Sequence, residues 1–171
     1  EGHFIFMATA NGTVKKTALT DFARQRSVGL RALQLDEGDV LVGTAITHGD
    51  GDVMLFSSEG KAVRFQETDV RSMGRTARGI RGIRLGAGHS MISLIIPRPG
   101  GMVLTVSENG YGKRTPTEEF PTKGRGGKGL IAMSTSARNG NMVGAVQVFA
   151  GDELMLISNQ GTLVRTRADE V

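Results

Sequence analysis

The sequence of 171 residues has no cysteine, no tryptophan, one tyrosine and four prolines. Without cysteine the chain can form neither disulfides nor thiolate metal sites, which fits a reducing cytoplasm. Its longest apolar run, residues 91–97, is far shorter than the ~20 residues that a membrane-spanning helix needs. The first residues also lack the basic and apolar segments of a signal peptide, and we expect the chain to be cut from a longer protein.

Catalytic patterns are also missing. The three histidines have no metal-site spacing, and no Ser, His and Asp arrangement is present. The single tyrosine, Tyr111, stands directly after a turn glycine, where Thr13, Lys61 and Thr162 stand at equivalent places, so we interpret it as an ordinary turn residue. Asp50-Gly51-Asp52 has the composition of a turn. We therefore predict no catalytic residue and no metal site in this segment.

What the sequence does contain is a repeat. Gly12, Gly60, Gly110 and Gly161 follow one another at intervals of 48, 50 and 51 residues, and a lysine or arginine stands four positions after each. Each glycine ends an apolar run, and two of the turns are Asn-Gly, the strongest short hairpin signal, for which we expect a type I′ turn. A period near fifty residues indicates one structural unit used in series.

Each repeat offers four short strands. The hairpin supplies two, the third is expected at 30–35, 80–85 and 130–134, and the fourth at 40–47, 91–96 and 142–148. This is the pattern of a propeller blade, and the helical alternative is weak because only residues 17–26 could form one or two turns. We predict a single all-β, propeller-like domain over residues 1–171, with repeats at 1–50, 51–99 and 100–149, a half repeat at 150–171 and hence an incomplete ring.

Positive charge gathers in one loop of each repeat. The loops end at Gly29, Gly79 and Gly129, and residues 123–129 read Lys-Gly-Arg-Gly-Gly-Lys-Gly. Of 21 lysines and arginines, 18 lie in or just after these loops or just after the turn glycines, although the net charge is only +4. Glycine permits close backbone approach and the cations suit phosphate oxygens, so the loops favour nucleic acid over a merely solvated surface.

The glycines at 124, 126 and 129 formally match the dinucleotide-binding pattern G-x-G-x-x-G. That fold needs a helix after the loop, whereas residues 130–133 have strand character. A nucleotide-binding enzyme is therefore the least favoured interpretation.

A family resemblance rests on the same loop. Arg125-Gly126-Gly127-Lys128-Gly129 resembles the last five residues of the Q-R-R-G-G-K-G box in the A subunit of DNA gyrase, and Lys123 and Gly124 stand where that box has Gln and Arg. Residues 7–17, 79–85, 109–115 and 161–167 are further similar stretches, so the resemblance covers essentially the whole chain. The similar family is the C-terminal DNA-wrapping domain of gyrase A. Its fold is a β-pinwheel, in which neighbouring four-stranded blades exchange strands.

The resemblance implies sequence-independent binding and wrapping of duplex DNA, in support of ATP-dependent negative supercoiling by a bacterial type IIA topoisomerase. The segment itself would be non-catalytic and hold no cofactor, with ATP and Mg²⁺ bound elsewhere in the complex. The implied partners are double-stranded DNA, the rest of gyrase A, and gyrase B. The implied location is the bacterial cytoplasm, at the nucleoid, with no membrane contact. Two alternatives remain open: the C-terminal domain of the A-type chain of topoisomerase IV, and a propeller-type scaffold for protein interactions.

The residues expected to contact phosphates form two groups. Those in the loops are Lys123, Arg125, Lys128, Arg75, Arg78, Arg81, Arg24 and Arg26. Those after the turn glycines are Lys15, Lys16, Arg64, Lys113, Arg114 and Arg165, for which protection of hairpin edges is an equally good interpretation. No aromatic residue lies in the loops, which argues against stacking on unpaired bases.

Overall fold

The computed structural model describes residues 2–171, which form thirteen β-strands, four short 3-10 helices and no α-helix. The strands are β1 (Phe4–Thr9), β2 (Thr13–Ala18), β3 (Leu41–Thr47), β4 (Asp52–Ser57), β5 (Lys61–Gln66), β6 (Ile80–Arg81), β7 (Met91–Ile95), β8 (Met102–Ser107), β9 (Gly112–Pro116), β10 (Leu130–Ile131), β11 (Met142–Val148), β12 (Glu153–Ile157) and β13 (Leu163–Arg167). The helices are η1 (Leu19–Phe22), η2 (Glu67–Asp69), η3 (Thr117–Glu119) and η4 (Ala168–Glu170). Within residues 2–171, nothing helical has the length and apolarity needed to cross a membrane.

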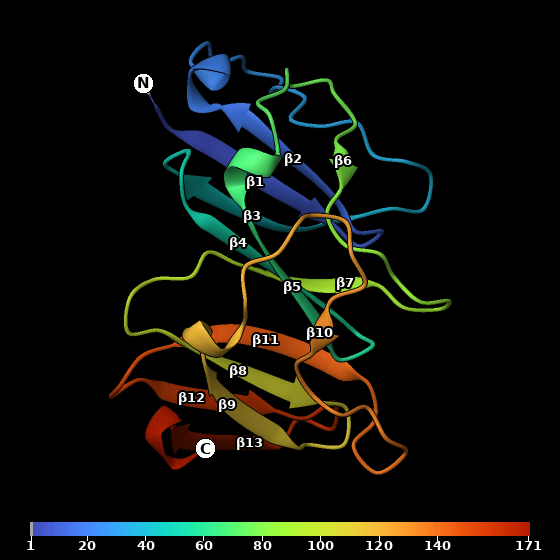
Figure 1. Cartoon of the computed structure of the whole chain (residues 1–171), viewed down its shortest axis with the longest axis vertical. Coiled ribbons are helices and arrows are strands. Elements are labelled where there is room, and N and C mark those ends of the chain that lie inside the picture. The colour runs from blue at the N-terminus through green and yellow to red at the C-terminus, as the bar shows by residue number, and fades with distance from the viewer. Residues whose placement is uncertain (1) are drawn as a thin grey trace.

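The strands form four antiparallel sheets that follow one another along the molecule (Figure 1). The strand orders are β3-β1-β2-β6, β10-β5-β4-β7, β11-β8-β9 and β12-β13. The sheets are the blades of an open, propeller-like ring, as predicted. The inner strands β3, β7 and β11 line one hollow of about 750 Å³, which lies where a propeller has its central channel.

Neighbouring blades exchange strands. The outer strand of the first blade, β6, comes from the second repeat and pairs with β2 through Thr13 and Val14. The outer strand of the second blade, β10, comes from the third repeat and pairs with β5 through Lys61 and Ala62. The strand exchange implied by the family resemblance is thus present between the first and second blades and between the second and third.

The third strands differ from the sequence prediction. Strands β6 and β10 have two residues each, against the six and five expected, and residues 30–35 form no strand at all. The reason is the exchange itself: a third strand needs the hairpin of the preceding repeat, and the described residues contain no hairpin before β1 for residues 30–35 to pair with. The hairpins and the fourth strands lie where predicted, within one or two residues.

The hairpin turns also differ from the prediction. Every residue with positive φ is a glycine, so Asn11 cannot occupy a type I′ turn. Instead the Gly12 N–H donates to the Thr9 carbonyl oxygen at 3.0 Å and Gly12 itself has φ of +83°. Gly60, Gly110 and Gly161 make the equivalent bond to Ser57, Ser107 and Ser158. This geometry matches the three-residue hairpin, in which a left-handed glycine follows the turn.

Each hairpin leads into a 3-10 helix that carries the acidic residue recurring in the sequence, namely Asp21, Asp69, Glu119 or Glu170. The helices η2, η3 and η4 each contact a basic side chain of the preceding blade. In η2, Glu67 is buried, and its carboxylate accepts bonds from the Thr47 hydroxyl at 2.7 Å and from the N–H groups of Gly49 and Gly51. The η2 segment is therefore structural.

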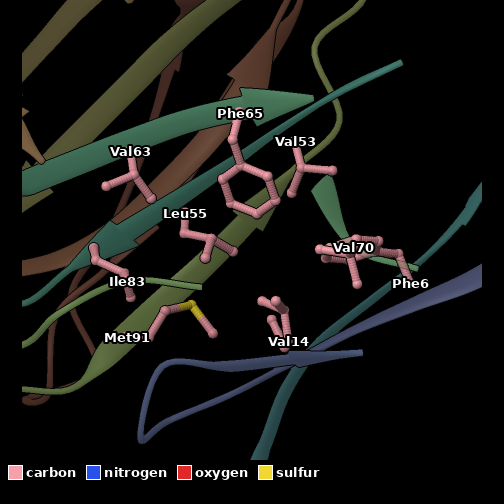
Figure 2. Close-up of a cluster of buried hydrophobic side chains, with 10 residues drawn as sticks. Phe6, Val14, Val53, Leu55, Val63, Phe65, Val70, Ile83 and Met91 are labelled. Carbon is pink, nitrogen blue, oxygen red and sulfur yellow. The ribbon is translucent and has the colours of Figure 1, made fainter. Parts of the chain in front are cut away.

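The core lies between blades. One apolar cluster joins the first blade to the second; it includes Phe6 and Val14 from one side and Val53, Leu55 and Phe65 from the other (Figure 2). A second cluster joins the second and third blades, and a smaller one of Leu104, Val148 and Ala168 joins the third to the fourth. Alternate side chains of one strand thus pack against the preceding blade and the following blade in turn. This explains why the strands are apolar on both faces.

Candidate nucleic-acid interface

Three basic loops lie side by side on the outer edge of the blades. We define loop 1 as residues 24–36, loop 2 as residues 71–86 and loop 3 as residues 121–136. Figure 1 shows loop 2 (green) above loop 3 (orange), on the side that carries β6 and β10. The positions of loops 2 and 3 follow from the strand exchange, because loop 2 contains β6, which pairs with the first blade, and loop 3 contains β10, which pairs with the second.

Hydrogen bonds join each loop to the one before it. The Arg75 guanidinium donates to the Arg31 carbonyl oxygen at 3.2 Å, and fifty residues later the Arg125 guanidinium donates to the Arg81 carbonyl oxygen at 2.6 Å. A second pair repeats in the same register: the Gln34 N–H donates to the Ala77 oxygen, and the Arg84 N–H to the Gly127 oxygen. Loops 1, 2 and 3 therefore form one connected band across the blades.

Most cations of this band face solvent. Arg24, Arg26, Arg81, Lys123 and Lys128 are exposed, and within residues 2–171 none of their side chains has a hydrogen bond or ion pair. Arg125 is exposed but uses one N–H on the neighbouring loop, and Arg75 is half-buried. Arg31, Arg71 and Arg84 were counted with the loop cations but not among the predicted phosphate contacts, and they are exposed in the same band. The arrangement presents a row of positive charge with accessible main chain.

Arg78 is the exception in loop 2, because its guanidinium pairs with the Asp36 carboxylate of loop 1 at 2.5 Å. Both side chains are exposed, so the pair itself stabilises the fold by at most about 1 kcal/mol. At the next junction the position equivalent to Asp36 is Gly86, and Lys128, the counterpart of Arg78, pairs with no carboxylate of residues 2–171. A polyanion would therefore compete with Asp36 for Arg78.

We expect Asp36→Asn to raise the affinity for duplex DNA by about two- to five-fold, because it frees Arg78 for a phosphate. The plot of log K against log[salt] should steepen by about 0.9 for the added contact. The matched control is Glu37→Gln, which removes the same charge from an exposed neighbour that has no ion pair within residues 2–171. Equal slopes for both variants would show that Arg78 gains no phosphate.

The prediction that Lys15 contacts DNA is wrong, because the side chain lies inside the protein. Lys15 is 1% exposed, and its ammonium donates to the carbonyl oxygens of Ala32 at 2.7 Å and Arg75 at 2.5 Å. Burial, and secondarily the nearby Arg75 charge, lower the pKa of Lys15 below its ordinary value. The residue thus holds loops 1 and 2 from beneath.

The prediction is also wrong for Lys16, which is 5% exposed and contacts Glu67 in the next blade. Arg64 and Arg114 stand at the same position of later repeats, and their side chains are about one-fifth exposed and paired with Asp52 and Asp169. Lys113 and Arg165 are exposed, and Arg165 pairs with Glu153 of its own hairpin. Periodicity located this position, but the carboxylate partners of Lys16 and Arg114 lie in the following repeat and give no local signal.

Within residues 2–171 no group of three histidines or carboxylates is placed to hold a metal ion. The lone tyrosine stacks with an arginine: the Arg138 guanidinium lies 4.8 Å from the centre of the Tyr111 ring, and its Nε donates to the Tyr111 hydroxyl at 2.9 Å. The band of loops is thus the feature of the fold that suits an extended polyanion.

The open ring of strand-exchanging four-stranded blades with a basic outer band defines a β-pinwheel domain. The family model described as the DNA gyrase C-terminal domain, beta-propeller, matches residues 3–48, 51–98, 101–148 and 152–171, and the chain belongs to this family.

Among curated proteins, the A subunit of DNA gyrase from Pseudomonas aeruginosa is 62% identical over 170 residues, which is 99% of this chain and 18% of the relative. The same protein from Escherichia coli is 56% identical over 171 residues, which is all of this chain and 20% of the relative. The chain therefore spans about one-fifth of the length of these proteins, and corresponds to the C-terminal domain of gyrase A.

Two solved structures are also similar. A DNA gyrase A C-terminal domain has a TM-score of 0.86 and 29% identity, covering 99% of this chain and 57% of that one. The C-terminal domain of a DNA topoisomerase IV has a TM-score of 0.92 but only 23% identity, covering all of this chain and 54% of that one. The second likeness shows the shared fold alone, whereas the sequence relatives favour gyrase.

Proposed function

We propose that this domain binds duplex DNA without sequence preference and bends it along the band formed by loops 1, 2 and 3. The observation that carries the proposal is the hydrogen-bonded continuity of that band, which keeps cations of successive blades in one row. Phosphate contacts fix position but read no sequence, and no helix among residues 2–171 could enter a major groove. Selectivity would then come from the bendability of the DNA.

The family gives the bend a purpose. As part of a gyrase A chain, the domain would wrap a DNA segment and present it to the cleavage gate, so that ATP-driven strand passage introduces negative supercoils. The rest of gyrase A, together with gyrase B, would be its protein partners in the bacterial cytoplasm. The catalytic tyrosine, ATP and Mg²⁺ would be held elsewhere in that complex, and the domain alone would have no activity.

The salt dependence of binding tests the proposal. If about six phosphates are contacted, log K should fall with log[salt] at a slope near −5. A relaxed plasmid treated with a nicking-closing enzyme in the presence of the chain should also change its linking number. A slope near zero would refute DNA binding, and a steep slope without a change in linking number would refute bending.

A topoisomerase IV domain, which would guide DNA choice with little wrapping, is the second candidate. The topoisomerase IV structure gives a high TM-score at low identity, so it supports the fold and not this function. The linking-number experiment separates the two, because the second candidate predicts binding with little change.

A further inference from the structure

One basic residue in each of the first three repeats reaches into the following blade. It is the basic residue four positions after the turn glycine, and in the first repeat it is Lys16. Its ammonium donates to the Glu67 carbonyl oxygen at 3.2 Å and lies 3.9 Å from the Glu67 carboxylate. Glu67 begins η2 of the second blade, and both side chains are nearly fully buried. The contact therefore joins the outer half of one blade to the helix of the next.

Arg64 makes the same kind of connection between the second and third blades. Its Nη1 donates to the carbonyl oxygens of Thr117 and Phe120, at 2.8 and 3.3 Å, at the two ends of the segment that forms η3. Its Nε donates to the Asp52 carboxylate at 2.7 Å, at the start of the first strand of its own blade. A single guanidinium thus ties the second blade to the third.

Arg114 continues the series, because its Nη1 donates to the Asp169 carboxylate of η4 at 3.1 Å. Arg165, at the same position of the fourth repeat, has only Glu153 of its own hairpin as a side-chain partner within residues 2–171. Lys16, Arg64 and Arg114 therefore each join their own blade to the next, and we call each such contact between blades a latch. The contact of Arg165 stays within its own blade.

We propose that Lys16, Arg64 and Arg114 are positioning residues that fix the angle between successive blades and so set the spacing of the phosphate contacts along the DNA. This inference rests on the proposed function. Each loop moves with the blades it bridges, so a change of angle at one junction shifts loop 3 relative to loop 2. Duplex DNA of about 30 bp is much shorter than the persistence length of roughly 150 bp, so it cannot follow such a shift without cost.

The test compares two duplexes. One of about 10 bp spans a single helical turn and can occupy one loop, whereas one of about 30 bp can reach all three. Arg64→Met keeps an unbranched apolar stem in place of the arginine methylenes and removes the guanidinium that contacts the third blade. We expect it to leave the affinity for the short duplex within about twofold, and to lower that for the long duplex at least tenfold, the equivalent of one or two lost phosphate contacts.

Arg165→Met is the matched control, because it removes one charge at the same position of a repeat without breaking a contact between the described blades. Its effect, whatever its size, should fall equally on both duplexes. Arg64→Lys keeps the charge but can satisfy fewer of the three acceptors, so it should restore the long-duplex affinity only in part. A circular dichroism spectrum and a melting curve establish that each variant is folded.

The outcomes are distinct. If wild type prefers the long duplex and Arg64→Met reduces both affinities by the same factor, the latch does not position the loops and the inference is wrong. Failure of Arg64→Lys to restore any of the long-duplex affinity lost in Arg64→Met would also overturn it, because Lys16 shows that an ammonium can make the same kind of contact. If wild type itself has no preference for the long duplex, the proposed bending function fails instead.

Discussion

Replacement of Lys123 and Lys128 together by glutamine should weaken duplex binding roughly 60-fold at 0.1 M salt. Each phosphate contact releases counterions worth about 0.9 of a log unit at that concentration, so two lost contacts cost about 1.8 log units. Both side chains are exposed and have no partner within residues 2–171, so their full charge is available to DNA. The salt slope should fall from near −5 to near −3. Titration of a labelled 30-bp duplex at several salt concentrations measures both quantities.

The control for general electrostatics is the double variant Arg98→Gln and Arg138→Gln. It removes the same two charges from exposed arginines outside the band, which lie beside the rings of Phe149 and Tyr111. We expect its salt slope to match that of wild type. An equal loss in both double variants would mean that DNA responds to net charge and not to loop 3.

Gly60→Ala should destabilise the fold by about 4 kcal/mol or more, whereas Gly110→Ala should cost only about 1–2 kcal/mol. Both glycines occupy the same turn position, with φ of +82° and +84°, so a side chain meets the same left-handed strain at each. A Cβ at Gly60 would lie 2.3 Å from the Met133 carbonyl oxygen, whereas a Cβ at Gly110 meets nothing within 4 Å. The difference between the two losses in the free energy of unfolding therefore measures the clash with the segment that contains the exchanged strand.

That clash has a structural consequence beyond the turn. The Gly60 carbonyl oxygen accepts bonds from the N–H groups of Ala132 at 2.8 Å and Met133 at 3.1 Å, directly after β10. Moving the strand aside removes these bonds, which contribute about 1 kcal/mol each. Urea unfolding measures the free energy of unfolding of each variant. Equal losses in the two variants would show that β10 and the residues after it can move aside without destabilising the fold.

The sequence predicted what is decided locally. The four hairpins follow from apolar runs that meet at a glycine, and the structure has a turn at each of the four predicted glycines. The turn type was wrong because the Asn-Gly rule assumes a two-residue loop, whereas here the bond from Gly12 to Thr9 closes a three-residue loop. Residue pattern alone does not distinguish the two loops.

What depends on distant partners could not be predicted from the residues. Pairing of β2 with β6 joins Val14 to Ile80, and no composition rule specifies that register. The burial of Lys15 depends on carbonyl acceptors 17 and 60 residues away, and the partner of Lys16 lies 51 residues away. Loop cations such as Arg24, Lys123 and Lys128 have no side-chain partner within residues 2–171, so the local pattern of charge and glycine was enough to locate them.

Because the first two blades take their outer strands from the following repeats, the blades are completed in the order in which the chain is synthesised. The first blade needs β6, which lies some thirty residues beyond the end of its own repeat. At about 5–20 residues per second, the ribosome adds those thirty residues in roughly 2–6 seconds, during which β2 has an open edge. A blade that takes its outer strand from the next repeat is completed only after that repeat has been synthesised. Folding of these blades therefore follows translation with a delay of about one repeat.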